Sequence, residues 1–163
     1  MNARLESQPF AILRPLAGLP VFVATGRDTI AIRPGTTINK DGRFDVGFEK
    51  ELAVEIVDLI PGGDYEIRLT PAGYPVAALA AALPKPDAIG GFHFAPGGNA
   101  AARHGGDDTP AINPCSIWDV GFRPACADPR GMALVERDGL RFWCDIYKLG
   151  VDHVAKGTSR HGE

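Results

Sequence analysis

The side chains that could do chemistry gather in one stretch, Gly90 to His153, which holds both tryptophans and all three cysteines. Zinc is usually bound by cysteine and histidine, but the spacing here includes no His-x-His, His-Glu-x-x-His or Cys-x-x-Cys motif. The pair Asp107–Asp108 has too few neighbouring oxygen donors for a calcium loop of the EF-hand kind. The sequence therefore predicts no metal site. The histidines considered for one are His93, His104, His153 and His161.

Nucleophilic catalysis would need a serine or cysteine beside a base. Ser116 and Ser159 lack the context of a nucleophile elbow, and Cys115 follows a proline without a basic neighbour. The glycine-rich run from Gly90 to Gly98 lacks the Gly-Lys-Ser/Thr end of a phosphate loop and predicts tight β-turns. No pair of carboxylates stands out for glycoside hydrolysis. The sequence therefore predicts that the protein is not an enzyme and uses no cofactor.

Composition narrows the class further. A chain of 163 residues suits one domain, or one domain with a small appendage. The net charge of −3 and the lack of a Lys/Arg cluster predict no nucleic-acid partner and no anionic membrane surface. Glu6 and Pro9 interrupt the place of a signal-peptide core, and no apolar run could span a bilayer. We expect a cytoplasmically made protein, not exported by a classical route, with reduced thiols at Cys115, Cys126 and Cys144.

The first half of the chain has a β pattern from Pro9 to about Leu69. Short apolar or alternating runs at 20–24, 29–33, 52–58 and 64–70 are separated by turn residues. Lys40-Asp41-Gly42 is typical of a hairpin turn, and the alternate residues Phe44, Val46 and Phe48 share one face of the strand after it. These features predict a mainly β protein that begins with a small antiparallel β-sandwich.

One segment departs from this pattern. Pro75 to Pro86 is rich in alanine and leucine and predicts a short helix or an irregular crossing. We place a soft boundary after it, between residues 84 and 88. The predicted organisation is an N-terminal arm (residues 1–8), a β-sandwich domain (residues 9–86), and a loop-rich segment with a β-hairpin (residues 87–163).

The hairpin is predicted from MALV and LRFWCDIYKL, which flank the turn Glu136-Arg137-Asp138-Gly139. Its second strand is unusually apolar on both faces, which indicates cover from both sides. In so short a chain, the second cover would be a partner subunit. The two faces consist of Phe142, Cys144 and Ile146, and of Trp143, Asp145 and Tyr147.

Arginine and aspartate alternate with aromatic residues in the same region. The planar guanidinium pairs bidentately with a carboxylate, so we interpret these residues as a network that pins loops rather than a ligand site. The residues are Trp118, Asp119, Phe122, Arg123, Asp128, Arg130 and Asp145.

A family resemblance rests on the elements GGFH, APG, NAAA, SIWD, FRPA, DPRGM, DIY and LGV. From Ile89 to Ser159 the chain resembles, almost without gaps, the major tropism determinant of phages that carry diversity-generating retroelements. From about Val21 to Thr70 the resemblance is looser but colinear. That family builds a trimeric receptor-binding protein at tail-fibre tips from a β-prism, a β-sandwich and a C-type-lectin fold. The resemblance implies a β-sandwich followed by the opening part of a C-type-lectin-like domain.

The resemblance includes neither the β-prism nor the later lectin strands with their variable surface. No receptor-contacting residue therefore transfers to this chain. What the resemblance implies is the scaffold and a tendency to trimerise.

Together, the residues and the resemblance predict a phage virion structural protein of the tail fibre or baseplate, assembled in the host cytoplasm. It would act as an oligomeric adapter or fibre segment, as a homotrimer in contact with other tail or baseplate proteins. The alternative is a module that binds a glycan or pilus on the host surface, through Asn99 to Pro114 and the Lys40-Asp41-Gly42 tip. The predicted packing surface between protomers, or to a partner chain, consists of Trp118, Phe122, Arg123, Arg130, Trp143 and Tyr147.

Overall fold

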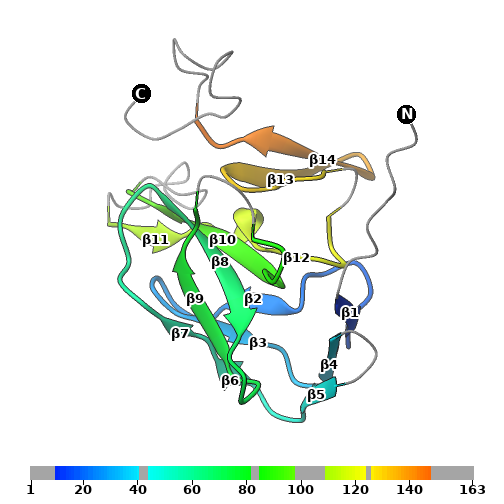
Figure 1. Cartoon of the computed structure of the whole chain (residues 1–163). Helices are drawn as coiled ribbons and strands as arrows, with labels where there is room; N and C mark the ends of the chain where they lie inside the picture. The colour runs from blue at the N-terminus through cyan, green and yellow to red at the C-terminus, as the bar shows by residue number, and fades with distance from the viewer. Residues whose placement is uncertain (1–9, 41–43, 82–84, 98–108, 124–125, 148–163) are drawn as a thin grey trace, which may run out of the picture.

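The structure is a computed structural model of the chain, and it describes residues 10–40, 44–81, 85–97, 109–123 and 126–147. Short strands form packed layers, and a hairpin forms a separate layer at the top of the view (Figure 1). Within these residues, no helix has the length and apolar character to cross a membrane.

Two three-stranded sheets contain most strands of the first third of the chain, in the orders β1–β4–β5 and β2–β3–β6. All their strand pairs are antiparallel. The strands of the first sheet are β1 (Phe10–Leu13), β4 (Thr36–Lys40) and β5 (Phe44–Phe48). Those of the second are β2 (Phe22–Ala24), β3 (Ile30–Ile32) and β6 (Leu52–Ala53).

The central sheet is six-stranded, with the order β11–β10–β8–β9–β7 and β12 also paired with β10. A 3-10 turn, η2 (Pro114–Ser116), connects β11 to β12, and the chain then forms the separate hairpin β13–β14. The strands of the central sheet are β7 (Glu55–Ile56), β8 (Gly63–Leu69), β9 (Pro75–Leu79), β10 (Gly90–Ala95), β11 (Ala111–Ile112) and β12 (Trp118–Asp119). The hairpin strands are β13 (Met132–Arg137) and β14 (Leu140–Asp145).

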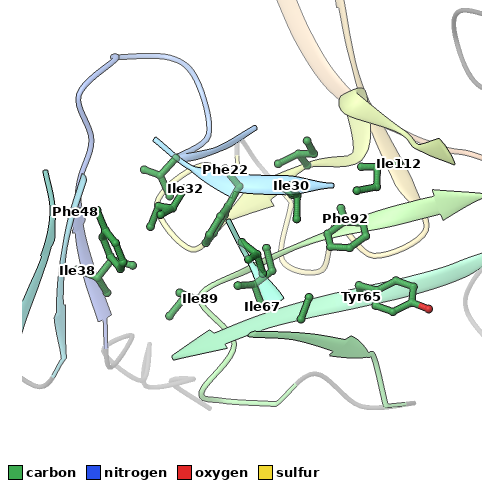
Figure 2. Close-up of a cluster of buried hydrophobic side chains, with 14 of the residues drawn as sticks. Phe22, Ile30, Ile32, Ile38, Phe48, Tyr65, Ile67, Ile89, Phe92 and Ile112 are labelled. Carbon is green, nitrogen blue, oxygen red and sulfur yellow. The ribbon is translucent and has the colours of Figure 1, made fainter. Parts of the chain in front are cut away.

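The hydrophobic core lies between the central sheet and β2–β3. Side chains alternate along a strand, so Tyr65 and Ile67 of β8 share one face, and both are fully buried. Opposite Tyr65 in the register, Phe92 of β10 stacks on it at a ring separation of 5.1 Å. Figure 2 shows Phe22 and Ile30 lying over this face. Residues of the first sheet, including Ile38 and Phe48, belong to the same core.

Several predicted strands are confirmed. The runs at 20–24 and 29–33 form the antiparallel pair β2–β3, closed by a hydrogen bond from Thr25 N to Thr29 O of 2.9 Å. Lys40 pairs with Phe44 across the predicted hairpin, whose tip at residues 41–43 lies outside the described residues. The mainly β fold class and the C-terminal hairpin are confirmed as well. The hairpin turn places Asp138 and Gly139 at φ values of 52° and 78°, as a type I′ turn requires.

The predicted helix is wrong. Pro75–Leu79 is strand β9, which pairs with β8 in the register Ile67↔Ala77. Pairing with an exposed strand edge and burial of Pro75 and Ala77 outweigh the weak helix preference of alanine and leucine.

The run at 52–58 does not form one strand. It divides at the buried Val54 into β6 and β7, which belong to different sheets. β7 pairs parallel with β9, so the expectation of a purely antiparallel sandwich is also wrong at this pair.

The predicted boundary between residues 84 and 88 does not separate two sheets. β9 and β10, on either side of it, flank β8 in the central sheet. The sheet extends to β12, so the sandwich reaches beyond the predicted limit at residue 86. In the SIWDVGF segment (residues 116–122), Ser116 ends η2 and Trp118–Asp119 forms β12.

Gly91 provides a test of this packing. An added Cβ there would meet Tyr65 O and, at 2.8 Å, the Trp118 ring. We expect Gly91→Ala to lower the free energy of unfolding by about 3 kcal/mol, because the neighbours are a backbone and a buried ring. Denaturant unfolding measures this.

Gly47→Ala is the matched control, since a Cβ at Gly47 would have no neighbour within 4 Å. We expect a change below about 1 kcal/mol. Equal effects of the two substitutions would contradict the close contact of Trp118 with β10.

Candidate functional site

The face of the central sheet that points away from the core is polar. On β8 it carries Asp64, Glu66 and Arg68, and on β10 it carries His93. The loop before β13 and the two ends of the hairpin contact this face, so it is where the hairpin layer joins the sandwich. The candidate site is therefore an interface inside the chain, built from hydrogen bonds and ion pairs.

Asp64 and His93 contact the residues that enter and leave the hairpin at its base. The Asp64 carboxylate lies 2.8 Å from His93 Nδ1, and its Oδ1 accepts a 2.9 Å hydrogen bond from Gly131 N. His93 Nε2 lies 2.7 Å from the Tyr147 hydroxyl. We call Asp64, His93, Gly131 and Tyr147 the base clasp. Gly131 directly precedes β13 and Tyr147 follows β14, so one carboxylate–imidazole pair fixes the start and the end of the hairpin.

Glu66 is a fully buried carboxylate beside the clasp. Its Oε1 lies 3.8 Å from Arg130 Nη1 and accepts a 3.3 Å bond from Lys85 N, and its Oε2 lies 3.5 Å from Arg68 Nη2. A buried carboxylate is costly unless cations compensate it. Arg130 therefore links the loop before β13 to this buried charge on β8, which Arg68 of the same strand also faces.

Arg130 also forms hydrogen bonds within its own loop. Its Nε and Nη2 donate to Asp128 at 2.8 and 2.6 Å, and its Nη1 donates to Ala81 O at 2.6 Å. Burial pushes the pKa of Asp128 up, but hydrogen bonds and charge from Arg130 outweigh it and leave that pKa below its ordinary value. The bidentate pair stiffens the loop that carries Gly131.

Asp119 forms a second buried centre. Its fully buried carboxylate accepts from Arg14 Nη2 at 2.9 Å and from the backbone of Val21 and Gly121, each at 2.8 Å. The segment before β2 is thus tied to the end of β12, which lies 98 residues from Val21 in the chain.

The aromatic residues predicted for a protomer interface lie mainly inside the chain. Trp118 and Phe122 are 3% and 8% exposed in the single chain, so little of either ring is accessible to a second protomer. Arg123 stacks over the Trp118 ring at 4.4 Å. Burial lowers the pKa of Arg123, and this effect outweighs the negative charge of Asp128, which raises it. These three residues close the sandwich near β12.

Two of the other predicted interface residues belong to the internal junction. Arg130 and Tyr147 contact the sandwich as described above. Trp143 is half-buried, and its Nε1 has no hydrogen-bond partner within the described residues. None of the six predicted residues forms an open apolar surface.

An apolar surface lies instead on the other face of the hairpin. Val135 and Phe142 are paired across the strands and are 37% and 46% exposed, and Leu140 is 71% exposed. We call Val135, Leu140 and Phe142 the outer hairpin face. The sequence indicated that the second strand is apolar on both faces, but the predicted packing surface included Trp143 and Tyr147 and not the exposed Leu140 and Phe142.

Sequence reasoning missed Arg14, Asp64 and Glu66. The alternation Asp-Tyr-Glu-Ile-Arg-Leu from residue 64 carried a signal for two of them, since it places Asp64, Glu66 and Arg68 on one face of β8. Arg14 had no local signal, because its partner lies 105 residues away.

The structure offers little for metal or thiol chemistry in the residues it describes. No group of three histidine, cysteine or acidic side chains there could hold a metal ion. His104, Asp107, Asp108, His153 and His161 lie outside the described residues. Cys115 is exposed, and Cys126 and Cys144 are half-buried.

Comparison with known proteins identifies the family. Residues 20–119 match the family described as the Mtd second domain. The chain belongs to this family. It is 42% identical over 165 residues to the tail fiber receptor-binding protein of Bordetella phage BPP-1, a match over 98% of this chain and 42% of that protein. The resemblance seen in the sequence is thereby confirmed.

Solved structures support the same assignment. The U1, M1 and P3c variants of the Major Tropism Determinant superpose with a TM-score of 0.78 at 40% identity. Each match covers 92% of this chain and 40% of the solved chain. The chain therefore spans about two fifths of the length of the relatives it matches.

The Asp119 centre yields a stability prediction. Asp119→Ala would leave Arg14 and two backbone N–H groups without their acceptor. We expect the free energy of unfolding to fall by about 3–5 kcal/mol, as when one partner of a buried ion pair is removed. Asp87→Ala is the control, because Asp87 is 54% exposed and lies 3.7 Å from Arg68, and we expect a loss below about 1 kcal/mol. A similar small loss for both variants would show that Asp119 is not a structural centre.

Tyr147 predicts a pH dependence. Burial, and secondarily the charge of Asp64, raise the pKa of Tyr147 to about 12. Its ordinary value is about 10, so the folded state holds this proton more tightly than the unfolded state. The resulting stability is present below about pH 10 and is lost as the pH rises toward about 12. Denaturant unfolding should show a steeper loss in this window for the natural chain than for Tyr147→Phe. Parallel pH profiles would argue against a buried hydroxyl at this position.

Proposed function

We propose that the chain is a phage virion structural protein of the tail fibre or baseplate, where it acts as an oligomeric adapter or fibre segment. The observation that carries this proposal is the match to a tail fiber receptor-binding protein over 98% of this chain. The matched part contains the sandwich and the hairpin mounted on it. We propose no catalytic role, since the fold is that of receptor-binding tail proteins and their named function is binding.

The contact between protomers is proposed at the outer hairpin face. Three large apolar side chains are exposed there on one side of a two-stranded sheet. An apolar patch of this kind on a soluble chain is typical of a protein–protein contact. A homotrimer is the state we propose, because it fits the threefold symmetry of a fibre. Other tail or baseplate proteins would then bind the assembled trimer.

A second candidate function is a host-surface binding module for a glycan or pilus. The relative's name includes receptor binding. A cleft of about 450 Å³ lies between the β2–β3 turn and η2, where part of the predicted binding loop contributes to its wall. Residues 99–108 of that loop lie outside the described residues. The cleft is lined by Ala24, Thr25, Gly26, Arg27, Ala111, Ile112 and Pro114.

Sedimentation at micromolar concentration tests the oligomeric proposal. We expect a trimer for the natural chain, and we expect Phe142→Asp to weaken association at least about 30-fold because a charge would enter an apolar contact. Tyr74→Asp is the matched control, since Tyr74 is an exposed aromatic residue outside the hairpin. It should leave the trimer intact.

A stable monomer, together with absence of the protein from purified virions, would overturn the adapter proposal. Binding of the tagged protein to host cells, lost on substitution of Arg27 in the cleft but not of Phe142, would instead favour the receptor-binding module.

A further inference from the structure

The hairpin lies outside the hydrophobic core of the sandwich. The core cluster runs from Phe10 to Ile117, and the described residues of the hairpin contribute none of its buried members. Hairpin side chains are half-buried on the inner face and exposed toward the turn. An isolated two-stranded hairpin is marginally stable in water. Its order in this protein therefore depends on how it is held to the sandwich.

The base clasp holds the hairpin at one end. Ile146 N donates to Gly131 O at 2.9 Å, which closes the base of the hairpin into a ring. Asp64 accepts a bond from one side of this ring and His93 meets the Tyr147 hydroxyl on the other. In the tautomer whose Nδ1–H donates to Asp64, Nε2 accepts a hydrogen bond from the Tyr147 hydroxyl. The two strands of the hairpin are thus held at their shared base by one side-chain pair, the buried His93 and the half-buried Asp64.

The distal end of the hairpin is held more weakly. Arg141 Nη1 donates to Gly18 O at 3.0 Å, but this bond is exposed to solvent. The turn at Arg137 and Asp138 is more than 80% exposed, with side-chain values of 83% and 88%. Release of the hairpin would therefore break these polar contacts at its base and the packing of half-buried inner-face residues such as Leu134 and Trp143, whereas the sandwich core would remain packed.

We propose that the β13–β14 hairpin is a hinged unit that releases from the sandwich at the base clasp while the sandwich stays folded. Local opening of this kind occurs where few buried apolar contacts hold an element. The loop before β13 is the other attached segment, and Arg130 keeps it on the sandwich through Ala81 O and Glu66. Because Arg130 stays attached to the sandwich, the hairpin would pivot about the residues that follow Arg130. Release would reorient the outer hairpin face relative to the sandwich. The inference concerns motion within one chain; because the proposed contact between protomers uses the same hairpin, it is tested on the dissociated chain.

Hydrogen exchange measured by mass spectrometry on the full chain tests the hinge. In the natural chain, we expect amides of β13 and β14 to exchange at least about tenfold faster than those of β8 and β10. Tyr147→Phe removes only the hydroxyl that contacts His93. It should accelerate exchange in the hairpin by about fivefold to tenfold and leave β8 and β10 unchanged, because one hydrogen bond of the closed state is lost. Tyr74→Phe, at an exposed tyrosine outside the hairpin, should change neither.

Three results would overturn the proposal. One is equal exchange of the hairpin and the central sheet in the natural chain, which would mean that the hairpin opens only on global unfolding. Another is equal acceleration of all strands by Tyr147→Phe. The third is no acceleration of the hairpin by that substitution, which would remove the clasp as the point of release.

Discussion

The pairing of β8 with β10 is the constraint on which the other layers depend. Its register places Tyr65 opposite Phe92 on one face and Asp64 opposite His93 on the other. The first pair belongs to the hydrophobic core, and the second holds the hairpin. Side chains alternate with a period of two, so a slip of one residue would turn the polar side chains into the core. One register therefore sets both the packing of the sandwich and the docking of the layer above it.

Two fully buried carboxylates set the positions of the irregular segments. Asp119 holds Arg14 and the backbone before β2, and Glu66 faces Arg68 and Arg130. Each carboxylate would be costly in the interior without its arginine partners. Segments with little regular structure are thus fixed by specific charge pairing rather than by a large apolar surface. This arrangement fits a scaffold whose loops must keep a defined shape.

The sequence predicted elements well wherever the signal was local. The type I′ turn at Asp138-Gly139 and the alternation in β5 need only neighbouring residues, and the resemblance covered the family assignment. Prediction from the sequence failed where the strand that pairs with a segment is distant in the chain. Pro75–Leu79 has alanine-rich composition, yet it extends as β9 because β8 offers an unpaired edge. Trp118 was expected at a surface, but Gly91 leaves room for its ring directly on β10.

The sequence by itself determined the β class, the hairpin, the family and the presence of an Arg–Asp network, because turn chemistry, side-chain alternation and motif order are written in short segments. Only the tertiary structure decided which partners the charges take. Asp64 meets Gly131 and His93 meets Tyr147 because strand pairing and layer stacking bring together residues 67 and 54 positions apart. Burial is a property of such assembled layers, so no local pattern could show that Trp118 is internal while Phe142 is exposed.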